Sequence, residues 1–247
     1  MKRNLLTSVI SFVLLMVTAT VSTADIYTGS GGGGFGGTIS GSTLELTYDS
    51  GTDVVSGRLD KGAGDFNDSF VLYLDTAVGG FADTSTFDDE QDSNRRAISG
   101  SSGSGDSDVV FNAGFDADFA IALSPVQGSF GGLWGLASGG NNSLNYVSSV
   151  NLSPLSNNAP FYTFSFDLAD IGLSVGDSFD FVGTYLNADN SFRSDEYYGS
   201  ATTAGNPGQA TFTFTDNLSF TAVPEPSSLA LMTAFGVGVV AVRRRRK

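Results

Sequence analysis

Acidic side chains gather in one short stretch of the chain, where they could bind a cation. Five carboxylates fall close together, at Asp83, Asp88, Asp89, Glu90 and Asp92. Ca²⁺ takes about six to eight oxygen ligands, and carboxylates this close repel one another unless a cation lies between them. The stretch is therefore a candidate Ca²⁺ site, and the alternative is a set of acidic loops that keep the protein soluble. Asp-x-Asp pairs also occur at Asp106 and Asp108 and at Asp116 and Asp118.

Three aromatic residues could bind a polysaccharide. Trp134 is the only tryptophan and lies among glycines, and the pair Tyr197 and Tyr198 precedes Gly199. An exposed aromatic ring with a polar atom can stack on a sugar ring and also form a hydrogen bond. The alternatives are a core position for Trp134 and the end of a strand for the tyrosine pair.

The chain contains no histidine and no cysteine. This composition excludes Ser-His-Asp and Cys-His catalysis and zinc sites built from these ligands. A glycosidase can work with two carboxylates alone, but nothing in the sequence selects a pair. We therefore expect no catalytic residues and a protein that is not an enzyme.

Hydrophobic residues alternate with polar ones along most of the chain. The alternating sets include Leu44–Tyr48, Phe70–Leu74, Phe119–Leu123, Tyr162–Leu168 and Phe212–Phe220. This period of two is typical of antiparallel strands with one buried face. We predict an all-β fold, a single antiparallel β-sandwich of jelly-roll type, over residues 38–222. The only local helix that we expect is a turn at residues 168–173, and the glycine-rich residues 25–37 should form a flexible linker.

The body between the two ends of the chain is strongly acidic. Seven of the 12 basic residues lie outside residues 25–225, which leaves five basic residues against 26 acidic ones between Asp25 and Glu225, a net charge of −21. Such a surface repels nucleic acid and anionic lipid. We therefore expect no nucleic-acid partner.

Residues 1–24 have the pattern of a signal peptide. Met1, Lys2 and Arg3 form a basic start, residues 5–21 are apolar, and residues 22–24 are small. Signal peptidase would cleave between Ala24 and Asp25, so the protein should be exported.

The C-terminal residues combine three features in a fixed order. Pro224, Glu225 and Pro226 come first, and the prolines should keep this strip extended and unpaired. Residues 227–242 carry no charge, and residues 243–247 are all basic. We expect a short transmembrane helix in the inner membrane with its basic end on the inside.

This order of features resembles the PEP-CTERM sorting signal of Gram-negative bacteria, over residues 223–247. The resemblance implies that an exosortase recognises Pro224, Glu225 and Pro226, removes the hydrophobic tail and delivers the body to the cell surface or the extracellular matrix. The chain would be the substrate in this process. The alternative is a plain C-terminal membrane anchor.

The body also resembles the family 9 carbohydrate-binding domains. Residues 164–181 are similar to a strand–turn–strand segment of these sandwiches, and residues 70–75 are similar to an early strand that ends in an aspartate. We predict a structural surface protein associated with biofilm. The alternatives are a carbohydrate-binding module that depends on Ca²⁺, and a polysaccharide hydrolase that uses carboxylates.

Overall fold

Two antiparallel sheets packed face to face form the body of this protein. The structure is a computed structural model, and it describes residues 24–136 and 144–223. The smaller sheet has the order β1-β3-β4-β12. Its strands are β1 (Asp25–Thr28), β3 (Thr43–Asp49), β4 (Val54–Asp60) and β12 (Phe161–Asp167). The predicted all-β sandwich is confirmed.

The larger sheet has the order β11-β10-β9-β5-β13-β14-β2. Strand β17 pairs with the first half of β13, and β14 pairs with the second half of the same strand. These strands are β2 (Ser30–Gly31), β5 (Ser69–Asp75), β9 (Phe119–Ser124), β10 (Phe130–Gly135), β11 (Asn145–Ser149), β13 (Ser178–Asn187), β14 (Phe192–Tyr198) and β17 (Leu218–Thr221). The central strands β5 and β13 therefore have paired neighbours on both edges.

The main core lies between the two sheets. In β3, Leu44, Leu46 and Tyr48 point inward and are buried, as the alternating sequence predicts. Strand β12 does the same with Tyr162, Phe164 and Phe166, and Phe70, Leu72 and Leu74 of β5 face them from the larger sheet. Burying a large apolar side chain stabilises a fold by about 1.5–3 kcal/mol. This shared interior holds the two sheets together.

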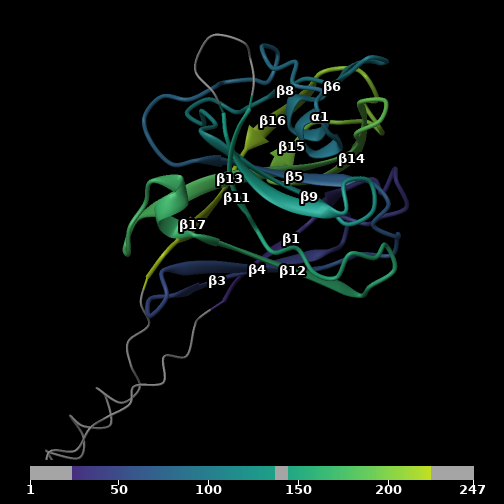
Figure 1. The fold of residues 1–247 in the computed structure, drawn as a ribbon. Helices are drawn as coiled ribbons and strands as arrows, with labels where there is room; N and C mark the ends of the chain where they lie inside the picture. The colour runs from purple at the N-terminus through teal and green to yellow at the C-terminus, as the bar shows by residue number, and fades with distance from the viewer. Residues whose placement is uncertain (1–23, 137–143, 224–247) are drawn as a thin grey trace, which may run out of the picture. The chain divides into compact units, whose positions relative to one another are not determined.

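A second core covers the outer face of the larger sheet. Val71 and Tyr73 of β5 point away from the sandwich interior, and both are buried. The cluster that contains them also includes residues of α1 (Ser93–Ser99), β8 (Val109–Val110), β15 (Ser200–Ala201) and β16 (Phe212–Asp216). These elements lie on the opposite side of the sheet from β3, β4 and β12 (Figure 1). Strands β6 (Ser101–Ser102) and β7 (Gly105–Asp106) pair with each other. The central strands of the larger sheet, such as β5 and β9, are thus buried on both faces.

The structure has two short helices, and the sequence predicted one of them. The turn expected at residues 168–173 is the 3₁₀ helix η1 (Leu168–Ile171). Helix α1 was not expected. At the start of α1, the Asp92 side chain accepts a hydrogen bond of 2.9 Å from the backbone N–H of Arg95. At its end, Gly100 adopts a left-handed conformation that terminates the helix. These two caps satisfy helix-end groups that would otherwise lack partners.

The glycine-rich segment is not the flexible linker that we expected. Strand β1 pairs with β3 and β2 pairs with β14, so residues 25–37 belong to the sandwich. Gly31 has a φ of 111°, and any Cβ at this position would collide with the carbonyl oxygen of Asp195. The glycines allow the backbone to approach β14 closely.

The Glu196 side chain binds the loop at residues 35–40 through its carboxylate. Its carboxylate is buried and accepts four backbone N–H groups, from Phe35 at 2.8 Å, Gly37 at 3.2 Å, Ile39 at 2.7 Å and Ser40 at 3.1 Å. Hydrogen bonds to a charged acceptor are stronger than those between neutral groups. Together with Asp195 Oδ1, which accepts from the Gly34 N–H at 2.8 Å, this carboxylate binds a loop that its composition suggested would be mobile.

Within the described residues, no helix is both long and apolar enough to cross a bilayer. The predicted signal peptide, except Ala24, and the predicted transmembrane helix lie outside the described residues.

Candidate functional site

The last described residues of the body are hydrogen-bonded to it and lie immediately before the predicted sorting motif. After β17, the backbone N–H of Ala222 donates to the carbonyl oxygen of Asp177 at 2.9 Å, and the Gly176 N–H donates to the Ala222 carbonyl at 2.7 Å. The motif residues Pro224, Glu225 and Pro226 follow, outside the described residues. Few residues therefore separate the last fixed backbone group from the motif.

The start of the body lies equally close to the predicted signal cleavage. Ala24 is the first described residue, and Asp25 opens β1. The cleavage expected between Ala24 and Asp25 would release the chain at its first strand.

The five carboxylates proposed for Ca²⁺ do not form one cluster, and two of them, Asp89 and Asp92, share Arg95 as an ion-pair partner. Asp89 is 5% exposed and accepts hydrogen bonds from Arg95 Nη1 at 2.7 Å and from the Leu144 N–H at 3.0 Å. Asp92 caps α1, and Asp83 accepts from the backbone N–H of Ser85 at 3.0 Å.

The remaining two carboxylates of this set also lack a common centre. Glu90 accepts from the Ser101 hydroxyl at 3.2 Å, and Asp88 is exposed. In the part of the chain that the structure describes, no group of three or more acidic residues is arranged to hold a metal ion. The predicted grouping of Asp83, Asp88, Asp89, Glu90 and Asp92 is therefore corrected, because a helix cap and an arginine take up two of these side chains.

The aromatic candidates are less exposed than sugar stacking requires. Trp134 is 2% exposed and belongs to the second core. Tyr198 is fully buried, and its hydroxyl lies 2.6 Å from that of Ser42. Tyr197 packs against Phe212 and Phe214 at the other side of β14. Tyr198 therefore packs in the main core and Tyr197 against the second core, because neighbouring residues of a strand point to opposite faces.

A hollow of about 420 Å³ lies beside α1 at the edge of the larger sheet. The lining comes from three places: helix α1 with its cap, the β9–β10 turn and the strands β10 and β11. These residues are Asp92, Ser93, Asn94, Arg95, Arg96, Gln127, Gly128, Phe130, Trp134 and Tyr146. Trp134 thus lines a hollow although its own surface is covered.

Two buried polar atoms in this lining, Nε1 of Trp134 and Oδ1 of Asn94, have no hydrogen-bond partner among the residues that the structure describes. Two other residues of the lining are exposed, Phe130 by 36% and Tyr146 by 50%. Asn94, Phe130 and Tyr146 were not predicted from the sequence as site residues. The signal for Phe130 was its spacing of four from Trp134, which places both side chains on one face of a strand.

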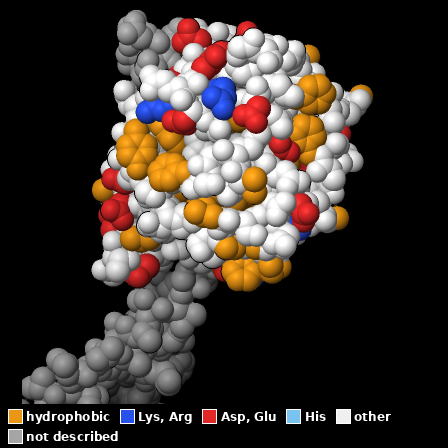
Figure 2. All heavy atoms as spheres, turned by 45° about the vertical axis from the view of Figure 1, so that its right-hand side comes forward, with side chains coloured by type: hydrophobic (Ala, Val, Ile, Leu, Met, Phe, Trp, Pro, Cys, Tyr) orange, Lys and Arg blue, Asp and Glu red, His pale blue; other side chains and the backbone are white. Residues whose placement is uncertain are grey.

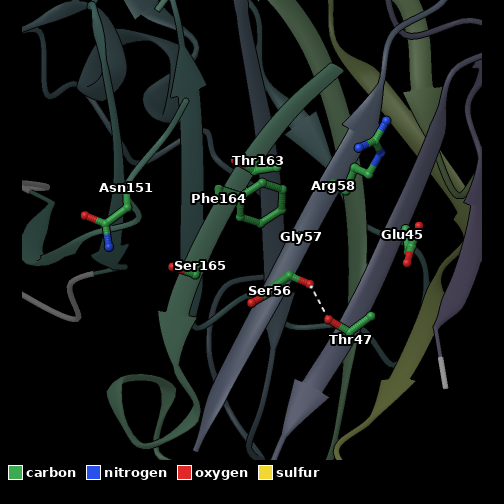
Figure 3. A pocket seen from close by; sticks show the side chains of 9 residues that line it. All are labelled: Glu45, Thr47, Ser56, Gly57, Arg58, Asn151, Thr163, Phe164 and Ser165. Carbon is green, nitrogen blue, oxygen red and sulfur yellow. Dashed lines mark hydrogen bonds between the residues drawn. The ribbon is translucent and has the colours of Figure 1, made fainter. Parts of the chain in front are cut away.

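A second hollow, of about 330 Å³, lies over β3, β4 and β12 on the outer face of the smaller sheet (Figure 3). Its lining is polar, with Thr47 Oγ1 donating to the Ser56 carbonyl at 3.5 Å. Arg58 pairs with Asp60 at 2.6 Å and lies over the ring of Phe161. Glu45 is the one carboxylate of the nine lining residues, so this hollow does not supply the acid pair of a glycosidase.

A third hollow, of about 470 Å³, carries three carboxylates, Asp75, Asp116 and Asp180. Asp75 and Asp180 lie opposite each other on β5 and β13, and the Asp116 N–H donates to Asp75 Oδ2 at 3.1 Å. Burial, and then the nearby charges of Asp118, Asp180 and Asp116, raise the pKa of the Asp75 carboxyl. The sequence analysis noted Asp116 only as part of an Asp-x-Asp pair.

Arg95 and Arg96 form ion pairs with three carboxylates. Arg95 pairs with Asp89 at 2.7 Å and with Asp92 at 3.2 Å, and Arg96 pairs with Asp189 at 3.2 Å. Figure 2 shows one face of the body, where acidic and hydrophobic side chains are scattered among uncharged polar ones and basic side chains are few.

Comparisons with known proteins identify the C-terminal segment and leave the body without relatives. No curated protein and no solved structure matched the chain. The resemblance of the body to family 9 carbohydrate-binding domains therefore stays a prediction. One family model, described as the PEP-CTERM protein-sorting motif, matches residues 222–247. These residues are thus a PEP-CTERM sorting motif, the signal by which an exosortase processes an exported protein that is held transiently in the membrane.

Proposed function

We propose that this protein is a non-enzymatic structural component of the cell surface or the extracellular matrix of a Gram-negative bacterium. In this proposal, signal peptidase first removes residues 1–24, and exosortase then acts at Pro224, Glu225 and Pro226. The observation that carries the proposal is the sorting motif at residues 222–247, which begins at the last described residues of the body.

The properties of the body support a structural role outside the cell. Its net charge of −21 favours solubility and discourages contact with anionic lipid once the tail is removed. The chain needs no disulfide, because two cores on both faces of a large sheet stabilise it. The charged residues lie mainly outside these cores, on a surface suited to an aqueous matrix.

Cell fractionation tests the sorting part of the proposal. An epitope tag can be inserted between Ala204 and Gly205, two exposed loop residues. We expect the tagged protein outside the cell at a mass that lacks both terminal segments. Replacing Pro224, Glu225 and Pro226 together by Ala should leave a longer chain in the membrane fraction, whereas replacing Ser227 and Ser228 by Ala should not. A full-length chain in the cytosol would overturn the proposal.

A strain that lacks this protein tests the structural role. We expect less extracellular matrix, restored by the normal chain and not by the Pro224, Glu225 and Pro226 variant. Unchanged matrix in the deleted strain would contradict a structural role while leaving the sorting result intact.

The absence of catalysis is tested on the same protein. We expect no new reducing ends when it is incubated with surface polysaccharide. Turnover that disappears in Asp75→Asn or Asp180→Asn would instead establish a carboxylate hydrolase.

A further inference from the structure

The hollow beside α1 combines exposed aromatic rings with buried polar atoms that lack partners among the described residues. Its volume of about 420 Å³ lies within the usual range for small-molecule sites, and its lining mixes apolar and polar groups as such sites do. We propose that this hollow binds an uncharged sugar residue of a polysaccharide. The proposal goes beyond the surface location and does not depend on it.

Three aromatic rings form one wall of the hollow. Trp134 packs edge-on against Tyr146 at 5.8 Å and against Phe130 at 6.3 Å between ring centroids. Gly132 lies between Phe130 and Trp134 on the same face of β10, and a Cβ there would come within 2.6 Å of Trp134 Cη2 and 2.8 Å of Phe130 Cε1. A side chain at this position would push the rings apart. The glycine thus allows a continuous aromatic wall with two exposed members.

The exposed rings are suited to an apolar face of a ligand. Tyr146 lies on the edge strand β11, directly opposite Trp134 in the register of β10 and β11. Its side chain is 50% exposed and makes no hydrogen bond within the described residues. An aromatic ring with a wet polar end is a frequent contact for ligands that have one apolar face and one polar edge.

The unpartnered atoms identify the chemical class of the ligand. Trp134 Nε1 can only donate a hydrogen bond, and Asn94 Oδ1 can only accept one. Asn94 is 3% exposed, and its amide nitrogen already donates to the Phe130 carbonyl at 3.3 Å, which fixes the orientation of the amide. A carboxylate or phosphate could satisfy only the indole, and an ammonium group only the amide oxygen. Hydroxyl groups donate and accept, so a sugar can satisfy both.

The two arginines in the lining argue against an acidic sugar. Arg95 Nη1 donates to Asp89 at 2.7 Å and to the Leu144 carbonyl at 2.8 Å. Arg96 donates to the Ala188 carbonyl at 3.0 Å and to Asp189 at 3.2 Å. Both guanidinium groups are therefore engaged with protein acceptors, and the net charge of the body disfavours an anion.

Trp134 provides a direct test, because it is the only tryptophan in the chain. The full-length chain is purified in a detergent without a sugar headgroup and titrated with cellotetraose, maltotetraose, mannotetraose and N-acetylchitotetraose. We expect at least one of these neutral tetrasaccharides to change the tryptophan emission in a saturable way. A tetrasaccharide of galacturonic acid should not.

Two variants locate the binding. Tyr146→Ala should weaken it roughly tenfold through loss of the stacking ring. The control is Phe161→Ala, which removes an aromatic ring from the smaller sheet, away from the hollow. Phe161 is 36% exposed, as Phe130 is, and its removal should leave sugar binding unchanged. Trp134→Phe keeps a ring and removes the N–H donor, and calorimetric titration should show binding about threefold to tenfold weaker.

The proposal fails if none of the four neutral tetrasaccharides gives a saturable signal, or if the acidic one binds more tightly than all of them. It also fails if Tyr146→Ala and Phe161→Ala bind equally well. None of these outcomes affects the fractionation test, so failure of sugar binding and failure of sorting are distinguishable.

Discussion

The Tyr27 hydroxyl donates a hydrogen bond of 2.7 Å to the backbone carbonyl of Ser219, which joins the first strand of the body to the last. The Tyr27 ring also packs edge-on against Phe181 of β13, with 4.8 Å between centroids. The described chain therefore begins and ends at neighbouring strands (Figure 1). In the sequence, the predicted signal peptide precedes β1 and the sorting motif follows β17, so the two expected cleavages would fall next to these two strands.

Removing the Tyr27 hydroxyl should weaken the contact between β1 and β17 and lower the stability of the body. Tyr27→Phe keeps the ring against Phe181 and leaves the Ser219 carbonyl without its donor, so we expect a loss of about 0.5–1.5 kcal/mol in the free energy of unfolding. Urea denaturation measures this difference. Tyr146→Phe is the control, because that hydroxyl makes no protein hydrogen bond within the described residues, and it should leave stability unchanged. Equal effects in both variants would contradict a role for the Tyr27–Ser219 contact.

The loop over Glu196 should depend on its negative charge. Glu196→Gln replaces one acceptor oxygen by an NH₂ group that faces backbone donors, so we expect a loss of about 2–4 kcal/mol. Hydrogen exchange should speed up at Phe35, Gly37, Ile39 and Ser40, whose N–H groups bind the carboxylate.

The matched control for this loop is Glu45→Gln. Glu45 lies on the outer face of the smaller sheet, where we expect a change within about 0.5 kcal/mol. If exchange in the loop stayed slow in Glu196→Gln, the loop would be ordered by its backbone alone.

Asp75 should destabilise the body at neutral pH. Burial and neighbouring carboxylates raise the pKa of Asp75. The folded state therefore holds the proton more tightly than the unfolded chain, and the ionised form above the folded-state pKa costs stability. Asp75→Asn should raise the melting temperature at pH 7. This gain should shrink as the pH falls through the raised pKa, because Asp75 is then protonated in the original protein as well.

Asp49 provides the opposite case as a control. Hydrogen bonds from Gly51 and Thr52 lower the pKa of Asp49, so its ionised form stabilises the folded state. Asp49→Asn should lower the melting temperature at pH 7, and the difference should vanish as the pH falls through the lowered pKa. Melting curves from pH 7 to pH 2 of both variants would show the opposite signs, and parallel curves would refute this assignment.

Asp92 should contribute to stability as a helix cap. Asp92→Ala removes the acceptor for the Arg95 N–H and the ion pair with Arg95, and we expect a loss of about 1 kcal/mol. Asp88→Ala, at an exposed position in the same stretch, should have little effect. The difference in melting temperature between each variant and the original protein should be the same with added Ca²⁺ and with a chelator. A Ca²⁺-dependent rise in melting temperature that Asp92→Ala abolishes would instead support a Ca²⁺ site at these carboxylates.

The placement of the acidic residues shows why a cluster in sequence was a poor guide to a metal site. Asp89 and Asp92 are neighbours along the chain, and both bind Arg95 because α1 brings it between them. Asp75 and Asp180 are far apart in sequence and lie opposite each other across two central strands. Proximity along the chain therefore did not predict which carboxylates lie together, since strand pairing decides which side chains meet.

Trp134 illustrates the same limit for the aromatic residues. Its isolation among glycines allowed either an exposed ring or a core position, and packing under α1 decided for the core. The neighbours that make it relevant to binding, Tyr146 and Asn94, come from an edge strand and from a helix that the sequence did not predict.

The sequence by itself determined the strands and the sorting motif, because a period of two and a contiguous motif are local properties of the chain. Only the tertiary structure decided that Glu196 and Asp195 would bind the glycine-rich segment and that the central strands of the larger sheet would be buried on both faces. It also decided that a hollow would form beside α1. Each of these features depends on contacts between residues far apart in the chain, where burial and hydrogen-bond satisfaction outweigh local preference.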